Sequence, residues 1–363
     1  MTFATNIKNP RTSIQFLAGL TWPAVSLILI LLIISLVSSL FGTDLIQLAV
    51  IEMLIMVVVV VGLYMFIGNS GIVSFGHPVF MLLGAYCTAW LTLPVPFKHM
   101  NLPGLPFFLA GHQYNVFLAA ITSGGFASVF AGVTGIVLMR LSGLAASMAI
   151  FCVLAVVHMV YANWDAVTLG RSSIVGLTTY VNVWVAFGWA AVAIAAAYTY
   201  QSSHFGLALR ATREDEVAAK ASGIHIMGQR MVAFVLSAFF VGVGGTLYGH
   251  YLGAISVDTF YITMVFTTLA MLVVGGMRSL SGAVIGVIVV SVFVELLREL
   301  ENGINLGGIA LTIPTYGQEL GLALLVILTL LFRPNGLMGD KELRWPLGIG
   351  MKRRLRIRER EEE

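Results

Sequence analysis

The feature that most constrains this sequence is a series of ten apolar runs. A transmembrane helix needs about 20 predominantly apolar residues. Only 10% of the residues are charged, whereas a soluble domain carries roughly 25%. We therefore predict an all-α fold, a polytopic transmembrane helical bundle of about ten spans. The runs lie at 22–41, 45–67, 76–93, 115–139, 143–162, 183–200, 231–252, 261–275, 282–300 and 318–332.

Three of these runs, at 76–93, 261–275 and 318–332, are short for a full crossing. We expect helices that are tilted, broken or re-entrant at these places. The long segment 94–114 contains four prolines, which predicts a stiff and irregular loop.

The distribution of basic residues gives the predicted bundle an orientation. Cytoplasmic loops of membrane proteins carry the excess of Lys and Arg. With the N-terminus inside, all of the 20 Lys and Arg fall on the inner side except Lys98, Arg171 and Arg298. We therefore predict cytoplasmic N- and C-termini. The transmembrane domain would span 1–338, followed at 339–363 by a charged, basic cytoplasmic tail that also contacts membrane lipid.

A charge-rich segment, 201–230, separates two apolar runs on the predicted inner side. Acidic residues favour the positive end of a helix, alanine forms helix with little bulk, and glycine permits a C-terminal turn. The sequence therefore predicts a short helix, a bend and a new span. By spacing alone, this is either a docking element for a soluble partner or an ordinary polar loop. The residues concerned are Glu214, Asp215, Glu216, Ala218, Ala219 and Gly223.

A second unusual segment follows the run at 45–67, where glycine and polar residues disfavour a continuous helix. Irregular backbone at membrane depth must be buried in protein or line a wet cavity. Pro78 suits the first turn of a helix that restarts there. Two interpretations stay open, a pathway or gate element and simple close packing. The residues are Gly68, Asn69, Ser70, Gly71, Ser74 and His77.

Several ionisable residues lie within the apolar runs. Because ionisable groups are costly in a membrane, each of them is a candidate for a functional or a structural role. Glu295 and Arg298 are three apart and are expected to pair, whereas Glu52 has no partner nearby in sequence. Glycines four apart, at 245–253 and 282–286, predict close helix packing. The ionisable residues are Glu52, His77, His158, His250, Glu295 and Glu319.

The sequence lacks the common catalytic motifs. It contains no Walker A loop, so ATP hydrolysis by that route would need a separate subunit. HExxH, GxSxG and CxxC are also missing, and Cys87 and Cys152 lie apart in apolar segments, so we expect no metal site, bound cofactor or disulfide. A membrane-embedded enzyme would need clustered acid, base or metal ligands, and the histidines are scattered over different runs.

The short inner helix carries the pattern E-x-A-A-x-x-x-G at Glu216, Ala218, Ala219 and Gly223. This pattern resembles the coupling motif of LivM-type branched-chain amino acid permeases of ABC importers. Segments similar to others of that family follow the same order and spacing, so that the resemblance runs from about 45 to 338. Arg171 departs from it, since the family often has glycine there. The similar segments are 68–86, 164–177, 233–249, 273–286 and 332–337.

The resemblance implies a permease without an ATPase site of its own, in a bacterial inner membrane, importing branched-chain amino acids. It implies a LivH-type partner permease and two ABC ATPase subunits that use ATP and Mg. It also implies a periplasmic substrate-binding protein seated on the loops 94–114, 163–182 and 301–317, and no nucleic acid. Segment 201–230 would be the cytoplasmic coupling segment. Urea, short amides or aromatic acids are alternative substrates, and an ion-coupled secondary transporter is an alternative class, with Glu52 as a weak coupling carboxylate.

Overall fold

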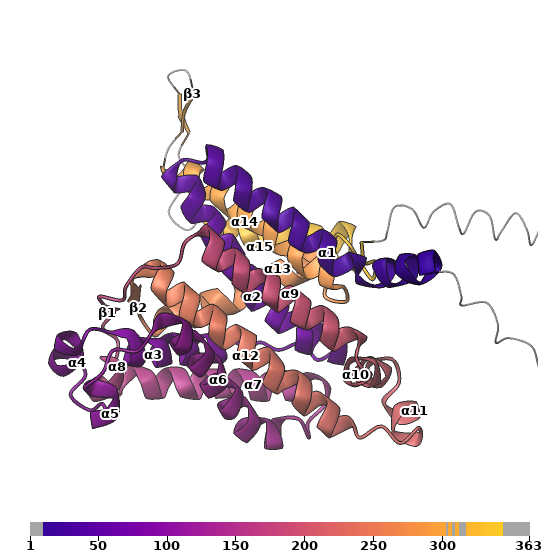
Figure 1. The fold of residues 1–363 in the computed structure, drawn as a ribbon, viewed down its shortest axis with the longest axis horizontal. Coiled ribbons are helices and arrows are strands. Elements are labelled where there is room, and N and C mark those ends of the chain that lie inside the picture. The colour runs from indigo at the N-terminus through magenta and orange to yellow at the C-terminus, as the bar shows by residue number, and fades with distance from the viewer. Residues whose placement is uncertain (1–9, 303, 307–308, 312–316, 344–363) are drawn as a thin grey trace, which may run out of the picture.

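Apolar runs of this length form helices because a helix pairs its backbone groups internally, where lipid offers no partner. The computed structural model describes residues 10–302, 304–306, 309–311 and 317–343. The described helices form one bundle, to which two short pairs of strands are attached (Figure 1). They are α1 (Pro10–Phe41), α2 (Asp44–Ser70), α3 (Pro78–Thr92), α4 (Val95–Asn101), α5 (Phe107–Ala110), α6 (Val116–Leu138), α7 (Gly143–Ala162), α8 (Asp165–Thr168), α9 (Val183–Ser202), α10 (His204–Glu214), α11 (Glu216–Ala221), α12 (Ile226–Leu252), η1 (Asp258–Phe260), α13 (Ile262–Gly275), α14 (Leu280–Asn302) and α15 (Gly317–Phe332).

Two antiparallel strand pairs complete the described structure. Strand β1 (Ile174–Val175) pairs with β2 (Ala254–Ile255), which joins the segment before α9 to the end of α12. Strands β3 (Ile304–Leu306) and β4 (Ile309–Leu311) form a hairpin after α14. The hairpin and the pair α10–α11 lie at opposite ends of the bundle (Figure 1). We call these two ends the hairpin end and the coupling end.

Each of the ten predicted apolar runs contains a helix, which confirms a polytopic helical bundle. Among the described residues, eight helical segments are long and apolar enough to cross a membrane. The three short runs differ from one another. Helix α3 bends by 117° into α4, α13 reaches spanning length only together with η1, and α15 has 16 residues. The number of crossings and the location of the termini stay predictions.

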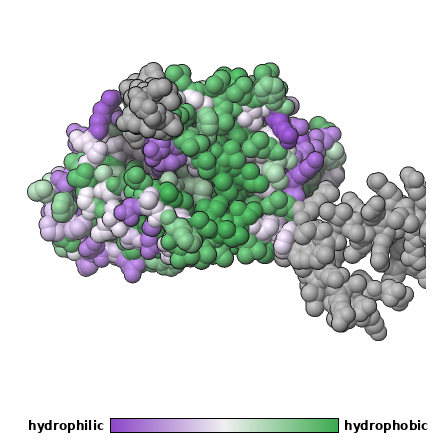
Figure 2. Space-filling model, turned by 90° about the horizontal axis from the view of Figure 1, so that it is seen from above, coloured by the Kyte–Doolittle hydropathy of each residue, from purple (hydrophilic) through white to green (hydrophobic). Residues whose placement is uncertain are grey.

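The surface of the protein shows why it needs a membrane. Hydrophobic side chains form a broad continuous area over the middle of the bundle, and hydrophilic residues gather towards its two ends (Figure 2). Leu331 on α15, Val129 on α6 and Val156 on α7 are each more than 60% exposed. Large exposed apolar areas of this kind belong in lipid or in an interface. The chain is a multi-pass membrane protein.

Helix α2 forms the centre of the bundle. Every residue from Met53 to Ser70 is buried, and the helix packs against α9, α12 and α14. Glycines let the neighbouring helices approach closely: a Cβ on Gly245 of α12 would collide with the carbonyl oxygen of Met81 on α3. A Cβ on Gly286 of α14 would likewise collide with the carbonyl oxygen of Met271 on α13. Both glycines therefore serve packing within the chain, as their spacing predicted.

The segment 94–114 is less irregular than its prolines predicted, because it contains the helices α4 and α5. Lys98 of α4 is buried, and its ammonium group donates hydrogen bonds to the carbonyl oxygens of Leu91 (3.2 Å), Leu109 (2.9 Å) and His112 (2.6 Å). These three bonds use all three donors of a lysine. Lys98 thus holds the loop in one conformation.

Candidate functional site

The coupling segment consists of two helices with a kink at Asp215. The side chain of Asp215 accepts hydrogen bonds from the backbone N–H groups of Val217 (2.8 Å) and Ala218 (2.9 Å), so it caps α11. Glu216 is the first residue of α11, as predicted. Glu214 instead ends α10, a helix that was not predicted from the sequence. The physical reason is that the cap at Asp215 interrupts the helix between the two glutamates.

The end of α11 has the conformation that its glycine predicted. Gly223 has a φ of +81°, a left-handed conformation that favours glycine. Its N–H donates to the carbonyl of Lys220 (3.1 Å), and the N–H of Ile224 donates to the carbonyl of Ala219 (3.1 Å). This pair of bonds is a Schellman motif, which ends the helix and reverses the chain direction. The chain then enters α12.

The free face of α11 is small and mostly apolar. Ala219 is buried, whereas Val217, Ala218 and Ala221 are exposed, and Val217 is 79% exposed. A six-residue helix has little stability of its own. Its shape is therefore maintained by the two caps and by contacts with the bundle. What remains accessible is a short ridge of small side chains at the coupling end.

One contact that fixes α11 is an ion pair with α12. The guanidinium of Arg230 lies 3.0 Å from a carboxylate oxygen of Glu216 and also donates to the carbonyl of Leu141 (3.4 Å), at the turn before α7. The Arg230 side chain is only 6% exposed, whereas that of Glu216 is 48% exposed. A buried cation that loses its partner costs far more than a surface one. Glu216 thus positions α11 rather than serving only as a free charge.

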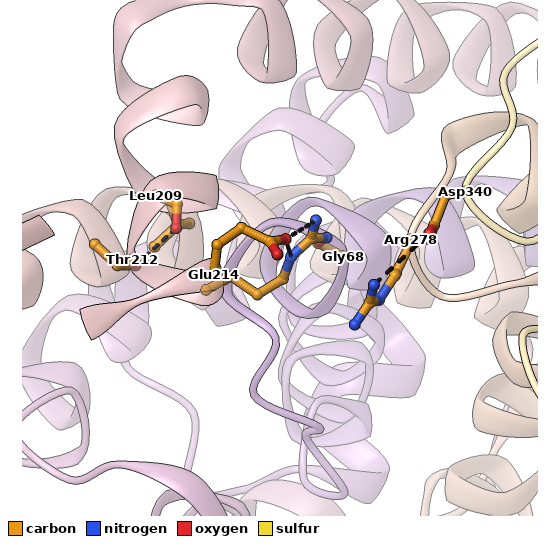
Figure 3. A network of polar contacts seen from close by, with 7 residues as sticks. Gly68, Leu209, Thr212, Glu214, Arg278 and Asp340 are labelled. Atoms are coloured by element: carbon orange, nitrogen blue, oxygen red, sulfur yellow. Dashed lines mark hydrogen bonds and ion pairs between the residues drawn. The ribbon is translucent and has the colours of Figure 1, made fainter. Parts of the chain in front are cut away.

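A second contact joins the coupling segment to α2. The Nη1 group of Arg213 donates to the carbonyl oxygen of Gly68 (2.7 Å), and Nη2 binds the Glu214 carboxylate (2.8 Å). Glu214 and Gly68 lie beside the ion pair of Arg278 and Asp340 (Figure 3). The hydrogen bond from Arg213 lowers the pKa of the Glu214 carboxyl below its usual value. The role of Arg213 could not be predicted from the sequence, because its partner Gly68 is 145 positions away.

The structure corrects the start of the break after the second apolar run. Gly68, Asn69 and Ser70 are the last residues of α2, and not part of the irregular segment. The helix continues because the Asn69 side chain donates to the carbonyl of Met65 (3.0 Å) instead of opening the last turn. It ends at Gly71, which has a φ of +74°. A Cβ on Gly71 would lie 2.6 Å from Cγ of Arg213.

The remaining residues of the break are buried between helices. The Ser70 hydroxyl accepts from the N–H of Ile72 (3.2 Å), and Ser74 is hydrogen bonded to Nδ1 of His77. His77 is 1% exposed and packs against the rings of Phe66, Phe80 and Phe234. Helix α3 then begins at Pro78, as predicted. The break is therefore tightly packed on its α3 side and open to the coupling segment at Gly71.

The chain after α15 returns to the coupling end. The N–H of Leu337 donates to the carbonyl of Val274 (2.9 Å) at the end of α13. The Glu342 carboxylate accepts from the N–H groups of Leu280 (2.8 Å) and Ser281 (3.0 Å), the first two residues of α14. A carboxylate at this place satisfies free N–H groups and the helix dipole. The segment 337–342 thus packs on the turn between α13 and α14.

Most ionisable residues in the spans have polar partners. Arg298 pairs with Glu295 (2.9 Å), as predicted, and also with Glu52 (3.5 Å). His158 binds Asp258 (2.9 Å), and His250 binds the hydroxyl of Thr88 (3.0 Å). Within the part of the chain that the structure describes, no group of three His, Cys, Asp or Glu is arranged to hold a metal.

Comparison with known sequences assigns the chain to a protein family. Residues 45–332 match the family described as "Branched-chain amino acid transport system / permease component". The chain belongs to this family. The match covers α2 to α15, and so includes both the coupling segment and the break. The members of this family are permease components of transport systems and are not known enzymes.

Relatives within the family carry the names LivM and LivH. The chain is 31% identical to LivM of Escherichia coli strain K12, a high-affinity branched-chain amino acid transport permease, over 135 residues. That stretch covers 37% of this chain and only 28% of the relative. A probable branched-chain amino acid transport permease LivH of Methanocaldococcus jannaschii is 24% identical, with 80% of this chain and 90% of the relative covered. No solved structure matches.

Proposed function

We propose that this permease is the membrane subunit of an ATP-driven ABC importer for branched-chain amino acids in a bacterial inner membrane. The observation that carries the proposal is the ridge of small side chains on α11. Arg230 binds this helix to α12, and Arg213 binds the preceding helix α10 to α2. A partner that seats this ridge moves a rigid element bonded to α2 and α12. ATP and Mg would be used by two separate ABC ATPase subunits.

The other proposed partners would contact the apolar side and the hairpin end of the bundle. The exposed apolar side of the helices would pack in part against a LivH-type permease, and the pathway would run between the two chains. A periplasmic binding protein would dock at the hairpin end, on 94–114, 163–182 and 301–317, of which 303, 307–308 and 312–316 lie outside the described residues. This orientation places α10 and α11 in the cytoplasm. The basic tail, whose residues 344–363 lie outside the described structure, would contact anionic lipid.

The residues proposed to couple ATP hydrolysis to transport are Glu214, Asp215, Glu216, Ala218, Ala219 and Gly223. In the structure they divide by role. Asp215 and Gly223 shape α11, Glu216 positions it, and Ala218 lies on the surface that a partner would contact. The residues proposed to transmit the movement are those around the break, from Gly68 to His77.

The test is uptake of radiolabelled leucine into proteoliposomes that contain this chain together with a LivH-type permease, two ABC ATPase subunits and a periplasmic binding protein. Uptake should require ATP on the side of α11 and should persist without an ion gradient. Ala218→Arg, which adds bulk to the exposed ridge, should abolish co-purification of the ATPases. Uptake by the chain alone, driven by a proton or sodium gradient, would instead identify an ion-coupled transporter. Competition with urea, short amides and aromatic acids assigns the substrate.

A further inference from the structure

A polar cavity of about 330 Å³ lies towards the hairpin end of the bundle. Its charged lining comes from three helices and η1. Glu52 lies just over two turns into α2, Arg298 one turn before the end of α14, and Glu319 in the first turn of α15. Asp258 of η1 completes the charged lining. The cavity thus lies at one end of α2, while the other end carries Gly68, which is bonded to Arg213.

The charges that line this cavity do not balance. The lining holds the three carboxylates of Glu52, Asp258 and Glu319 and one guanidinium, that of Arg298. With His158, the partner of Asp258, counted as neutral, the formal charge is −2. Arg298 makes its short bond, 2.9 Å, to Glu295 outside the lining. Its distance to the Glu52 carboxylate is 3.5 Å, longer than the 2.7–3.2 Å of ordinary N–H···O bonds. Glu52 therefore retains acceptor capacity for a further cationic group.

Another part of the cavity is apolar. Met264 of α13, Val294 of α14 and Leu322 of α15 line it, together with the ring of Tyr248 from α12. The volume would hold on the order of ten waters. A site with a few charged groups beside an apolar wall is typical of small-ligand pockets. The matching ligand has an ammonium group, a carboxylate and a compact apolar body.

We propose that this cavity binds the zwitterion of an aliphatic α-amino acid, with the ammonium group on Glu52 and Glu319 and the carboxylate on Arg298. The proposal rests on the function proposed above and assigns the substrate a site in this chain. The ammonium group supplies three donors to an acidic site, and the carboxylate replaces part of the Glu52–Arg298 ion pair. The aliphatic side chain contacts Met264 and Leu322. The cavity would thus hold the solute at the end of the bundle remote from α11.

The experiment measures protection of a cysteine in the cavity. The substitution Thr263→Cys places a thiol at an exposed position of the cavity lining. The chain also carries Cys87→Ala and Cys152→Ala, so that this thiol is the one that reacts. Modification by the cation 2-aminoethyl methanethiosulfonate and the anion 2-sulfonatoethyl methanethiosulfonate is timed in nanodiscs. Thr179→Cys, in the exposed loop after β1 and outside the cavity lining, normalises the two rates. The cationic reagent should be favoured at Thr263→Cys by about tenfold, as an excess of negative charge requires.

L-Leucine should slow the modification of Thr263→Cys, whereas 4-methylpentanoate, which lacks the ammonium group, should not. Glu52→Gln and Glu319→Gln should each raise the leucine concentration for half protection by about tenfold. Glu299→Gln, on the same helix as Arg298 but outside the cavity lining, should leave it unchanged. Protection by the amine isopentylamine alone, as strong as by leucine, would assign a cation site without Arg298 and overturn the proposal. No protection by leucine, or equal protection by all three compounds, would also overturn it.

This outcome is separable from the outcome for the proposed function, because protection needs no ATPase and no second permease. Protection in a chain that shows no ATP-driven uptake would retain the site and reject the importer. ATP-driven leucine uptake without protection would retain the importer and reject the site. Glu319 is exposed, so Glu319→Gln tests the cavity even where Glu52→Gln fails to fold.

Discussion

The guanidinium of Arg213 donates a hydrogen bond of 2.7 Å to the carbonyl oxygen of Gly68, and thereby joins the coupling segment to the last turn of α2. That carbonyl is among the last four of the helix, which have no partner inside it. The contact is made by a side chain rather than by the backbone. In the importer proposed above, this hydrogen bond would carry a movement of α10 to the end of α2.

We expect Arg213→Gln to separate ATP hydrolysis from transport. A hydrogen bond from a charged donor contributes about 1.5–3 kcal/mol, so its loss should lower leucine uptake per ATP hydrolysed by about tenfold or more. The measurement is uptake and phosphate release in the same proteoliposomes. Lys341→Gln, an exposed positive charge lost after α15, is the control and should leave the ratio unchanged. Equal loss of both activities would contradict a transmitting role for Arg213.

Gly71→Ala should destabilise the protein more than Gly223→Ala does. Both glycines have positive φ, +74° and +81°, so each alanine pays about 1–2 kcal/mol of backbone strain. At Gly71 the new Cβ would also lie 2.6 Å from Cγ of Arg213, whereas at Gly223 nothing lies within 4 Å. The difference in thermal unfolding midpoint in detergent measures the contact. If both glycine substitutions are made in a chain that carries Arg213→Gly, the excess of Gly71→Ala over Gly223→Ala should disappear.

The ion pair of Glu216 and Arg230 should show a coupling free energy of roughly 1 kcal/mol, between the values for exposed and buried pairs. A double-mutant cycle with Glu216→Gln and Arg230→Met, followed by chemical unfolding in mixed micelles, measures it. For each contact that is lost, Arg230→Met should destabilise the protein less than Glu216→Gln does. Glu216→Gln leaves the buried guanidinium of Arg230 without its charged partner, whereas Arg230→Met leaves no buried cation. A coupling near zero would mean that the caps of α11 alone maintain its position.

Two acidic residues of the segment after α15 should behave differently. Glu342→Ala removes the carboxylate that accepts from the first two N–H groups of α14, and should cost about 1 kcal/mol, as the loss of a helix cap does. Asp340→Ala removes a 3.7 Å pair with Arg278 whose side chains are both more than half exposed, and should change stability by less than about 0.5 kcal/mol. Thermal unfolding of both variants checks this. Equal effects would show that the cap is not formed.

The long helices could be predicted from the sequence because each apolar run has about the length of the helix that it forms. The ends of α11 could be predicted because Asp215 and Gly223 act on residues next to them in sequence. What could not be predicted depends on distant partners. Arg213 and Gly68 are 145 positions apart, and no local pattern relates them. The partner of Glu52 is Arg298, on a helix near the other end of the chain. The helix α10 was missed because it lies within a charge-rich segment and its charges resemble those of a loop.

The position of α2 has a consequence for how any solute passes. Its valines from Val57 to Val61 are all buried and fill the axis of the bundle with hydrocarbon. The centre of the described bundle is therefore packed, and in the importer proposed above a polar solute would travel along the flank of this chain. Such a route has one wall in this chain, and the second permease of the proposed importer would supply the other.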